Sequence, residues 1–301
     1  MKSELLWGLD LGGTKIESVV LDKSSKKVLA RERIPTEAAK GYHHILNQIT
    51  KLVELTSKKI NSTPQTIGIG MPGALDSQNK MVKNSNTVCL NNQPLKNDLE
   101  KMLGFPIVMA NDANCFALAE TKMGIVPQIY PEAQVVFGVI IGTGVSGGIV
   151  VNGKIINGRH GIAGEWGHNF LDESSGPCYC GQFGCVENII SGPALEKFYY
   201  DLSGKKKYLP EIVKLIKKDD KATQTINRLN EMFGKGVAAV INILDPDVII
   251  IGGGVGNIDS LYDEGRDHIK KYLFNDCLDT LIVKPKLGDS AGVFGAAMLA
   301  D

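Results

Sequence analysis

The sequence predicts an α/β protein built from two domains. Its 301 residues suffice for two domains of ordinary size, and 43% of them are hydrophobic, which is enough for a core in each. Short apolar runs rich in β-branched residues alternate with longer segments of helical periodicity. In each half of the chain, two such runs flank a glycine-rich turn, so a strand–turn–strand unit occurs twice.

The charge balance narrows the classes of partner. The chain carries 33 basic and 33 acidic side chains with no long run of either sign, which argues against binding to nucleic acid or an anionic membrane. The first apolar run is broken by Gly8 and Asp10 and is too short for a signal peptide or a membrane span. Thiols without a secretion signal indicate the reducing cytoplasm.

The first strand–turn–strand unit joins residues 5–9 to residues 16–21 through a glycine turn. Such a turn can present backbone N–H groups to a phosphate, and Thr14 and Lys15 add a hydroxyl and a positive charge. Asp10, at the end of the first strand, could hold Mg²⁺ through water. A plain hairpin turn explains the same residues, because short glycine motifs are weak signals.

The second unit runs from a strand over 135–141 through a glycine-rich turn to a hairpin over 149–156. Gly142, Gly144 and Gly147 match the G-x-G-x-x-G pattern of dinucleotide-binding proteins. That pattern requires a helix after the turn, whereas β-branched residues and the tight-turn pair Asn152-Gly153 follow here. A P-loop is excluded as well, because Ile155 stands where Ser or Thr must meet Mg²⁺.

Three further predicted strands end in polar or glycine-rich loops, where open α/β sheets place their ligands. Residues 66–70 lead to Gly73, which can touch a substrate through its backbone or serve as a simple turn. Residues 106–110 lead to Asn111 and Asp112 at the start of a helix, where an Asx pair is by default a cap. Residues 248–251 lead to three glycines, which can admit a flat purine or ribose or form a flexible turn.

A loop over residues 165–187 carries the ligands of a metal site. His168, Cys178, Cys180 and Cys185 give the four donors of a closed tetrahedral zinc site, while a redox pair is the alternative. The zinc ion would fix Glu165 and Glu187 relative to one another as two free carboxylates, which suit sugar hydroxyls.

These motifs together resemble one protein family. Glu-x-Gly-His followed by Cys-x-Cys-Gly-x-x-Gly-Cys-x-Glu is similar to the signature of the ROK family of sugar kinases and sugar-responsive repressors. The turn after Asp10 resembles the phosphate-binding hairpin of the actin, hexokinase and heat-shock-ATPase superfamily. The resemblance implies an actin-like ATPase (ribonuclease H-like) fold with two α/β domains around a nucleotide cleft, whose two glycine turns clamp the phosphates.

The resemblance also implies roles for individual residues. Asp112 would be the catalytic base that accepts the proton of the sugar hydroxyl. Sugar contacts would come from Gly73, Asn111, Asp112, Glu165, His168 and Glu187. ATP contacts would come from Gly8, Asp10, Gly12, Gly13, Thr14, Lys15, Gly142, Thr143, Gly144, Gly252, Gly253 and Gly254. The cofactors would be a structural Zn²⁺ and Mg²⁺ bound with ATP.

We therefore expect an N-terminal domain over residues 1–115, joined by a C-terminal helix at about 290–301, and a larger domain over 116–289 with the zinc loop. The resemblance is nearest to bacterial fructokinases and mannokinases, so the predicted reaction is phosphorylation of a 6-hydroxyl by ATP, with fructose as the first expectation and mannose or glucose next. Alternatives are an N-acetylglucosamine or N-acetylmannosamine kinase and a non-catalytic sugar sensor. A strand that begins at Leu5 leaves no room for the DNA-binding segment of the repressors. We also expect a cytoplasmic homodimer.

Overall fold

The computed structural model describes residues 4–301, which divide into two compact units. The first unit comprises the chain up to Pro131 together with Gly148–Ala163 and Lys286–Asp301, and the second comprises Glu132–Gly147 and Gly164–Pro285. Residues 116–131 and 148–163 thus fall in the first unit, whereas the sequence-based boundaries assign them to the second domain. The domain boundaries expected from the sequence stay a prediction, because the two units are defined by contacts alone.

The first unit is built on a five-stranded sheet of order β3-β2-β1-β4-β7. Its strands are β1 (Leu5–Leu11), β2 (Lys15–Asp22), β3 (Val28–Pro35), β4 (Ile67–Met71) and β7 (Ile107–Asn111). The first three strands are antiparallel to one another, whereas β1, β4 and β7 are parallel. The carboxyl ends of these parallel strands therefore meet at one edge of the sheet, which is where ligands bind in open α/β sheets.

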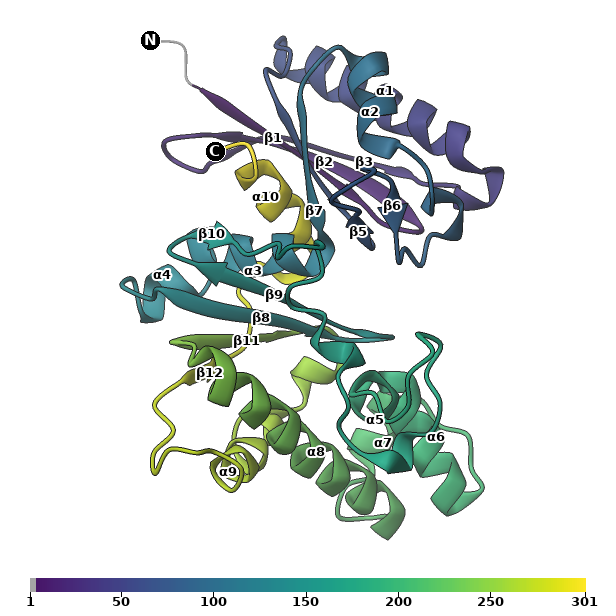
Figure 1. Ribbon diagram of the computed structural model, residues 1–301, viewed down its shortest axis with the longest axis vertical. Helices are drawn as coiled ribbons and strands as arrows, with labels where there is room; N and C mark the ends of the chain where they lie inside the picture. Colours follow the sequence, from purple (N-terminus) through teal and green to yellow (C-terminus); the bar gives the residue numbers. More distant parts are fainter. Residues whose placement is uncertain (1–3) are drawn as a thin grey trace. The chain divides into compact units, whose positions relative to one another are not determined.

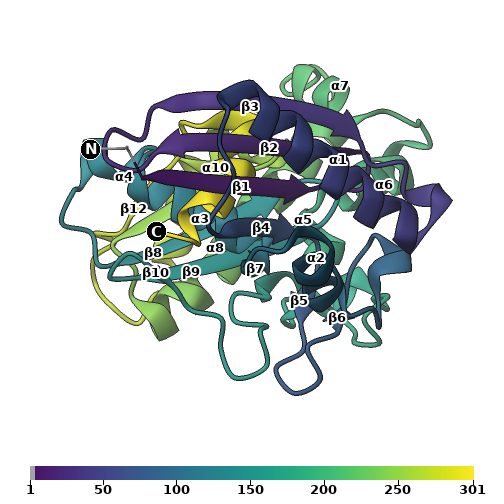
Figure 2. The same cartoon turned by 90° about the horizontal axis from the view of Figure 1, so that it is seen from above.

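Helices cover both faces of this sheet (Figure 1). On one face lie α1 (Tyr42–Ile60) and α2 (Leu95–Leu103), and on the other lie α3 (Asp112–Lys122) and α10 (Ala291–Met298). Figure 2 shows β3, β2 and β1 side by side in that order. The apolar residues of α1 recur at three- and four-residue steps and are buried, with Ile45, Ile49 and Leu52 fully inaccessible in the core. Small additions are α4 (Val126–Ile129) and the two-stranded pair β5 (Ala74–Leu75) and β6 (Val82–Lys83).

A second five-stranded sheet has the order β10-β9-β8-β11-β12. Its strands are β8 (Val135–Ile141), β9 (Val145–Val151), β10 (Lys154–Ile155), β11 (Val248–Gly252) and β12 (Leu281–Val283). In the second unit, β11 is parallel to both β8 and β12 and is buried along its whole length. A buried parallel strand is expected to read as a continuous run of β-branched residues, as this one does.

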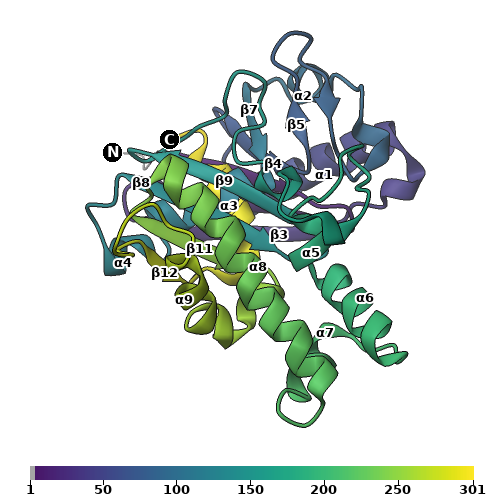
Figure 3. The same cartoon turned by 60° about the horizontal axis from the view of Figure 1, so that its bottom comes forward.

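The second unit is otherwise helical. Its longest helix is α8 (Asp220–Leu244), which packs against α6 (Gly192–Ser203) and α9 (Glu264–Lys270) (Figure 3). The short helices α5 (Glu187–Ile190) and α7 (Leu209–Lys214) complete it. No helix among residues 4–301 combines the length and the apolar character that crossing a bilayer requires.

Candidate active site and metal-binding loop

Two carboxylates stand at the carboxyl ends of β1 and β7, the strands on either side of β4 in the first unit. Asp10 is the penultimate residue of β1, and Asp112 is the first residue of α3, directly after β7. Burial raises the pKa of Asp10 to about 6, and the negative charge of Asp112 contributes further to that rise. Gly292, on α10, faces the Asp10 carboxylate so closely that a Cβ atom there would lie 3.4 Å from its oxygens. Two nearby carboxylates attract a cation, which would lower the pKa of the buried Asp10.

Asn111 is both a helix cap and a brace for the site. Its Oδ1 accepts a hydrogen bond from the Ala113 N–H at 2.8 Å, which is the capping role, while its Nδ2 donates to the Gly73 carbonyl at 3.1 Å. Gly73 has a φ of 82°, and a Cβ atom there would lie 2.5 Å from the Lys83 carbonyl oxygen. The turn after β4 is therefore restricted to glycine and is tied to the end of β7.

The first glycine turn is held by backbone and hydroxyl groups. The Gly12 N–H donates to the Lys15 carbonyl at 3.0 Å, and the Thr36 hydroxyl donates to the Gly12 carbonyl at 2.6 Å. Gly13 and Thr14 at its tip are exposed. Gly13 also lies on the wall of a cavity of about 520 Å³, lined further by Ala38, Ala39 and residues 86–89. The turn is thus fixed in shape while its tip faces solvent, as phosphate binding requires.

Gly8 lies outside the first glycine turn. It occupies the middle of β1, where a Cβ atom would meet the Ala297 nitrogen at 2.4 Å and the Val293 carbonyl oxygen at 2.5 Å. The close approach of α10 therefore accounts for glycine at this position without any contact to a nucleotide. A role for Gly8 in ATP binding stays a prediction that the packing does not require.

In the second unit, the two other glycine motifs are neighbours. Strands β8 and β11 are parallel, with Gly252 opposite Ile140. Gly142 and Gly253, which follow the carboxyl ends of these strands, therefore lie at the same edge of the second sheet. Gly253 has a φ of 82°, and a Cβ atom there would lie 2.3 Å from the Ile141 carbonyl oxygen. Around Gly142 and Gly254 a Cβ atom would meet no atom within 4 Å, so open space borders both.

Glu187 makes a contact that the sequence did not predict, while its role in sugar binding stays a prediction. It begins α5, and its Oε2 accepts a hydrogen bond from the Val145 N–H at 2.8 Å. A Cβ atom on Gly144 would lie 2.6 Å from the same oxygen, so a side chain there would displace the Glu187 carboxylate. The residue predicted to bind sugar therefore also supports the second glycine turn.

Glu165 and His168 flank a short 3₁₀ turn that is anchored by Trp166. The buried indole donates from Nε1 to the Gly236 carbonyl on α8 at 3.2 Å and meets the Phe137 ring edge-on at 6.1 Å. Burial raises the pKa of Glu165, and the negative charge of Glu187 adds to this rise. The Glu187 contribution indicates that the two carboxylates lie near one another in the second unit.

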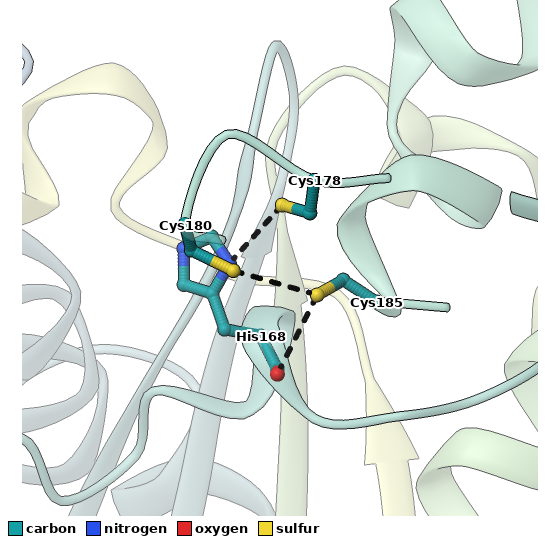
Figure 4. Close-up of side chains that lie close together, drawn as sticks. All are labelled: His168, Cys178, Cys180 and Cys185. Carbon is teal, nitrogen blue, oxygen red and sulfur yellow. Dashed lines mark hydrogen bonds between the residues drawn. The ribbon is translucent and has the colours of Figure 1, made fainter. Parts of the chain in front are cut away.

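The four predicted metal ligands converge (Figure 4). The donor atoms of His168, Cys178, Cys180 and Cys185 all lie within 4.8 Å of one another. The Cys180 and Cys185 sulfurs are 3.6 Å apart, too far for the about 2.05 Å of a disulfide. The His168 Nδ1 lies 3.7 Å from the Cys178 sulfur.

These separations suit a tetrahedral ion. Zinc–sulfur bonds of about 2.3 Å at tetrahedral angles place two sulfurs about 3.8 Å apart, and a sulfur and a nitrogen about 3.6 Å apart. The measured 3.6 Å between the Cys180 and Cys185 sulfurs and 3.7 Å between the Cys178 sulfur and His168 Nδ1 agree with that geometry. The residues therefore fit a Cys₃His zinc site closed to other ligands.

The comparisons with known proteins agree with this arrangement. The sequence profile of the ROK family matches residues 6–301. The chain belongs to the ROK family. It is 37% identical over 309 aligned residues to an N-acetyl-D-glucosamine kinase of Histophilus somni, with 98% of each chain covered.

Solved ROK structures share the fold. A ROK hexokinase from Thermus thermophilus superposes with a TM-score of 0.88 at 29% identity, covering 98% of this chain and 97% of that one. A ROK family glucokinase from Streptomyces griseus, in complex with glucose and AMPPNP, superposes with a TM-score of 0.77 at 27% identity, covering 98% and 99%. The actin-like ATPase fold is thereby confirmed, and the chain is a sugar kinase of the ROK family, with sugar and ATP as its small-molecule partners.

The expectation of fructose specificity is wrong. Curated relatives that match 98% of this chain, including those of Histophilus somni and Haemophilus influenzae, are N-acetyl-D-glucosamine kinases. The fructokinase assignment rested on three short segments, residues 82–86, 91–95 and 165–169. ROK kinases for different sugars share their frame, so such segments discriminate poorly between substrates.

One residue near the ROK metal loop was missed from the sequence. Tyr179, between Cys178 and Cys180, places its hydroxyl 3.1 Å from His168 Nε2 and its ring edge-on to the imidazole, with centroids 5.3 Å apart. Desolvation and then the charge of Glu187 raise the pKa of Tyr179 to about 12. No spacing rule marks the variable position of a Cys-x-Cys pair, so only the folded loop reveals this contact.

Proposed function

We propose that this ROK kinase is an ATP-dependent N-acetylglucosamine kinase that phosphorylates the 6-hydroxyl of its substrate. The similarity to N-acetyl-D-glucosamine kinases over 98% of the chain supports this choice of sugar. The observation that carries the chemistry is Asp112, placed at the start of α3 beside the buried Asp10. A carboxylate at such a strand end is within reach of a bound ligand.

In the proposed reaction, the sugar O6 attacks the γ-phosphorus of ATP. A bond forms between O6 and that phosphorus, the bond between it and the β–γ bridging oxygen breaks, and ADP leaves. Asp112 accepts the O6 proton. An ordinary aspartate suffices for this role, because the proton leaves late and positioning carries most of the catalysis in phosphoryl transfer.

Both units contain groups with proposed roles. In the first unit these are Asp112, the glycine turn after Asp10 and the hydrogen-bonded pair Asn111–Gly73. In the second unit they are the glycine turns at 142–144 and 252–254, proposed for ATP. Glu165, His168 and Glu187 are the proposed partners of the sugar hydroxyls and the acetamide group.

Two metal ions have distinct proposed roles. Mg²⁺, bound with ATP near Asp10, would neutralise charge on the phosphates. Zn²⁺, held by His168, Cys178, Cys180 and Cys185, would fix the loop that carries the sugar-binding groups. The homodimer and the cytoplasmic location stay predictions.

The decisive experiment measures ADP release from Mg-ATP with N-acetylglucosamine, N-acetylmannosamine, glucose and fructose supplied separately. We expect the largest kcat/KM with N-acetylglucosamine. Asp112→Asn should lower kcat roughly 10²- to 10⁴-fold while the fold and the zinc content stay unchanged.

Other outcomes would redirect the assignment. A larger kcat/KM with N-acetylmannosamine or glucose would move the substrate and leave the kinase in place. Sugar binding by calorimetry without turnover of any of the four would favour a sensor. An Asp112→Asn variant that retains most of its activity would rule out Asp112 as the base.

A further inference from the structure

Tyr179 is largely exposed, yet its side chain makes two contacts with the same residue, His168. Its relative accessibility is 82%, and exposed aromatic side chains of loops rarely keep a fixed contact. Here the hydroxyl lies 3.1 Å from His168 Nε2, and the tyrosine ring meets the imidazole at an interplanar angle of 89°. Two independent contacts, one polar and one aromatic, therefore fix the histidine ring against Tyr179.

The two nitrogens of His168 face different groups. Nδ1 faces the Cys178 sulfur at 3.7 Å and thus the four-ligand cluster, whereas Nε2 faces the Tyr179 hydroxyl. A histidine that ligates a metal through Nδ1 must carry its proton on Nε2, and it then donates that proton to an acceptor. The tyrosine hydroxyl oxygen is positioned to be that acceptor.

We propose that Tyr179 is a positioning residue, which holds the His168 ring with Nδ1 toward the zinc site. Its effect on the sugar rests on the proposed function, in which zinc fixes the loop that carries the sugar-binding groups. The zinc side rests only on the convergence of the four donor atoms. Partners that hydrogen-bond to a metal-bound histidine typically contribute 10- to 100-fold to metal affinity.

The test uses Tyr179→Phe, which keeps the aromatic ring and removes only the hydroxyl. Zinc transfer from the full-length protein to a colorimetric chelator should become about 10-fold faster. The visible absorption bands of the cobalt-substituted protein should shift, because the His168 ring reorients relative to the ion. With N-acetylglucosamine, KM should rise more than kcat falls.

Two further variants complete the design. Tyr179→Ala also removes the ring contact and should release zinc faster than Tyr179→Phe, with an unchanged far-ultraviolet circular dichroism spectrum. Tyr200→Phe is the matched control, because it makes the same chemical change at a half-exposed tyrosine on α6. It should match wild type in zinc release, cobalt spectrum and KM.

Equal zinc release and an identical cobalt spectrum in Tyr179→Phe and wild type would overturn the proposal. So would a wild-type protein that takes up neither zinc nor cobalt. If wild type proves inactive toward N-acetylglucosamine, the proposed function fails, while the contrast in zinc release between Tyr179→Phe and Tyr200→Phe still decides the role of Tyr179.

Discussion

The Glu187 carboxylate accepts a hydrogen bond from the Val145 N–H at 2.8 Å and thereby joins the end of the metal loop to the start of β9. The sequence assigned Glu187 to the sugar and the neighbouring Gly144 to ATP, as separate functions. In the structure the same carboxylate oxygen lies where a Cβ atom on Gly144 would intrude. Within the second unit, this hydrogen bond therefore links the carboxylate proposed for the sugar to the glycine turn proposed for ATP.

Substitutions of Glu187 should separate its charge from its support of the turn. Glu187→Gln keeps an acceptor for the Val145 N–H, whereas Glu187→Ala leaves that N–H without its partner, at a cost of about 1–3 kcal/mol. We expect both variants to raise KM for the sugar. Only Glu187→Ala should also raise KM for ATP and lower the free energy of unfolding in urea. Equal KM values for ATP in the two variants would contradict this coupling.

The raised pKa of Asp10 predicts a pH-dependent stability in the absence of added Mg²⁺. Burial, Asp112 and Glu17 raise this pKa from 3.8 to about 6, so the folded state binds the proton more tightly than the unfolded state. Between about pH 4 and 6 the folded state keeps a proton that the unfolded state has lost. The contribution of Asp10 to stability should therefore fall as the pH rises through this interval, by about 2–3 kcal/mol.

Asp10→Asn removes this titration. At pH 7 the variant should be more stable than wild type by about 2–3 kcal/mol, and below about pH 4 the difference should vanish. Urea unfolding between pH 4 and 7 measures it. A constant difference between the two proteins across this range would show that burial of Asp10 is not what costs stability.

Most of the fold was predictable because periodicity and glycine placement report on local structure. The strands expected over 66–70, 135–141 and 248–251 are β4, β8 and β11. The elements that were missed are short: α2, α9 and β12 have no more than nine residues each. Segments of that length carry too few turns or alternations to define a period.

The site was predictable as a set of residues but not as a set of contacts. The convergence of His168 with three cysteines follows from ligand spacing, because the loop that joins them is short. The bonds of Glu187 to Val145 and of Asn111 to Gly73 link residues 42 and 38 positions apart, so no local pattern encodes them. The sugar was mispredicted because shared motifs describe the common frame and not the pocket.

Zinc binding should release protons. Burial, together with Cys180 and Cys178, raises the pKa of the Cys185 thiol to about 12, so this thiol is protonated at neutral pH in the metal-free protein. Zinc binds the thiolate, so each ion must displace that proton, and its affinity should fall about tenfold per pH unit for each proton released.

Chelator competition at pH 6.5 and 7.5 measures this dependence, and calorimetry in buffers of different ionisation enthalpy counts the protons. Cys185→Ser should lose most of the zinc affinity. Cys277→Ser is the control, because this exposed cysteine lies outside the cluster and contacts Asp279. Zinc affinity that does not vary with pH would mean that the ligands are already deprotonated.

Gly8 and Gly12 lie four residues apart, but replacement by alanine should have different effects: mainly lower stability at Gly8 and mainly a higher KM for ATP at Gly12. At Gly8 a methyl group would press on the α10 backbone at 2.4–2.8 Å, so Gly8→Ala should destabilise the protein by about 1–3 kcal/mol. At Gly12 the nearest atom is the Lys15 carbonyl oxygen at 3.0 Å, at a turn that faces solvent. Gly12→Ala should therefore change stability less and raise KM for ATP more. Urea unfolding and ATP kinetics on both variants measure these effects. A Gly8→Ala protein with wild-type stability and a raised KM for ATP would show instead that Gly8 contributes to nucleotide binding.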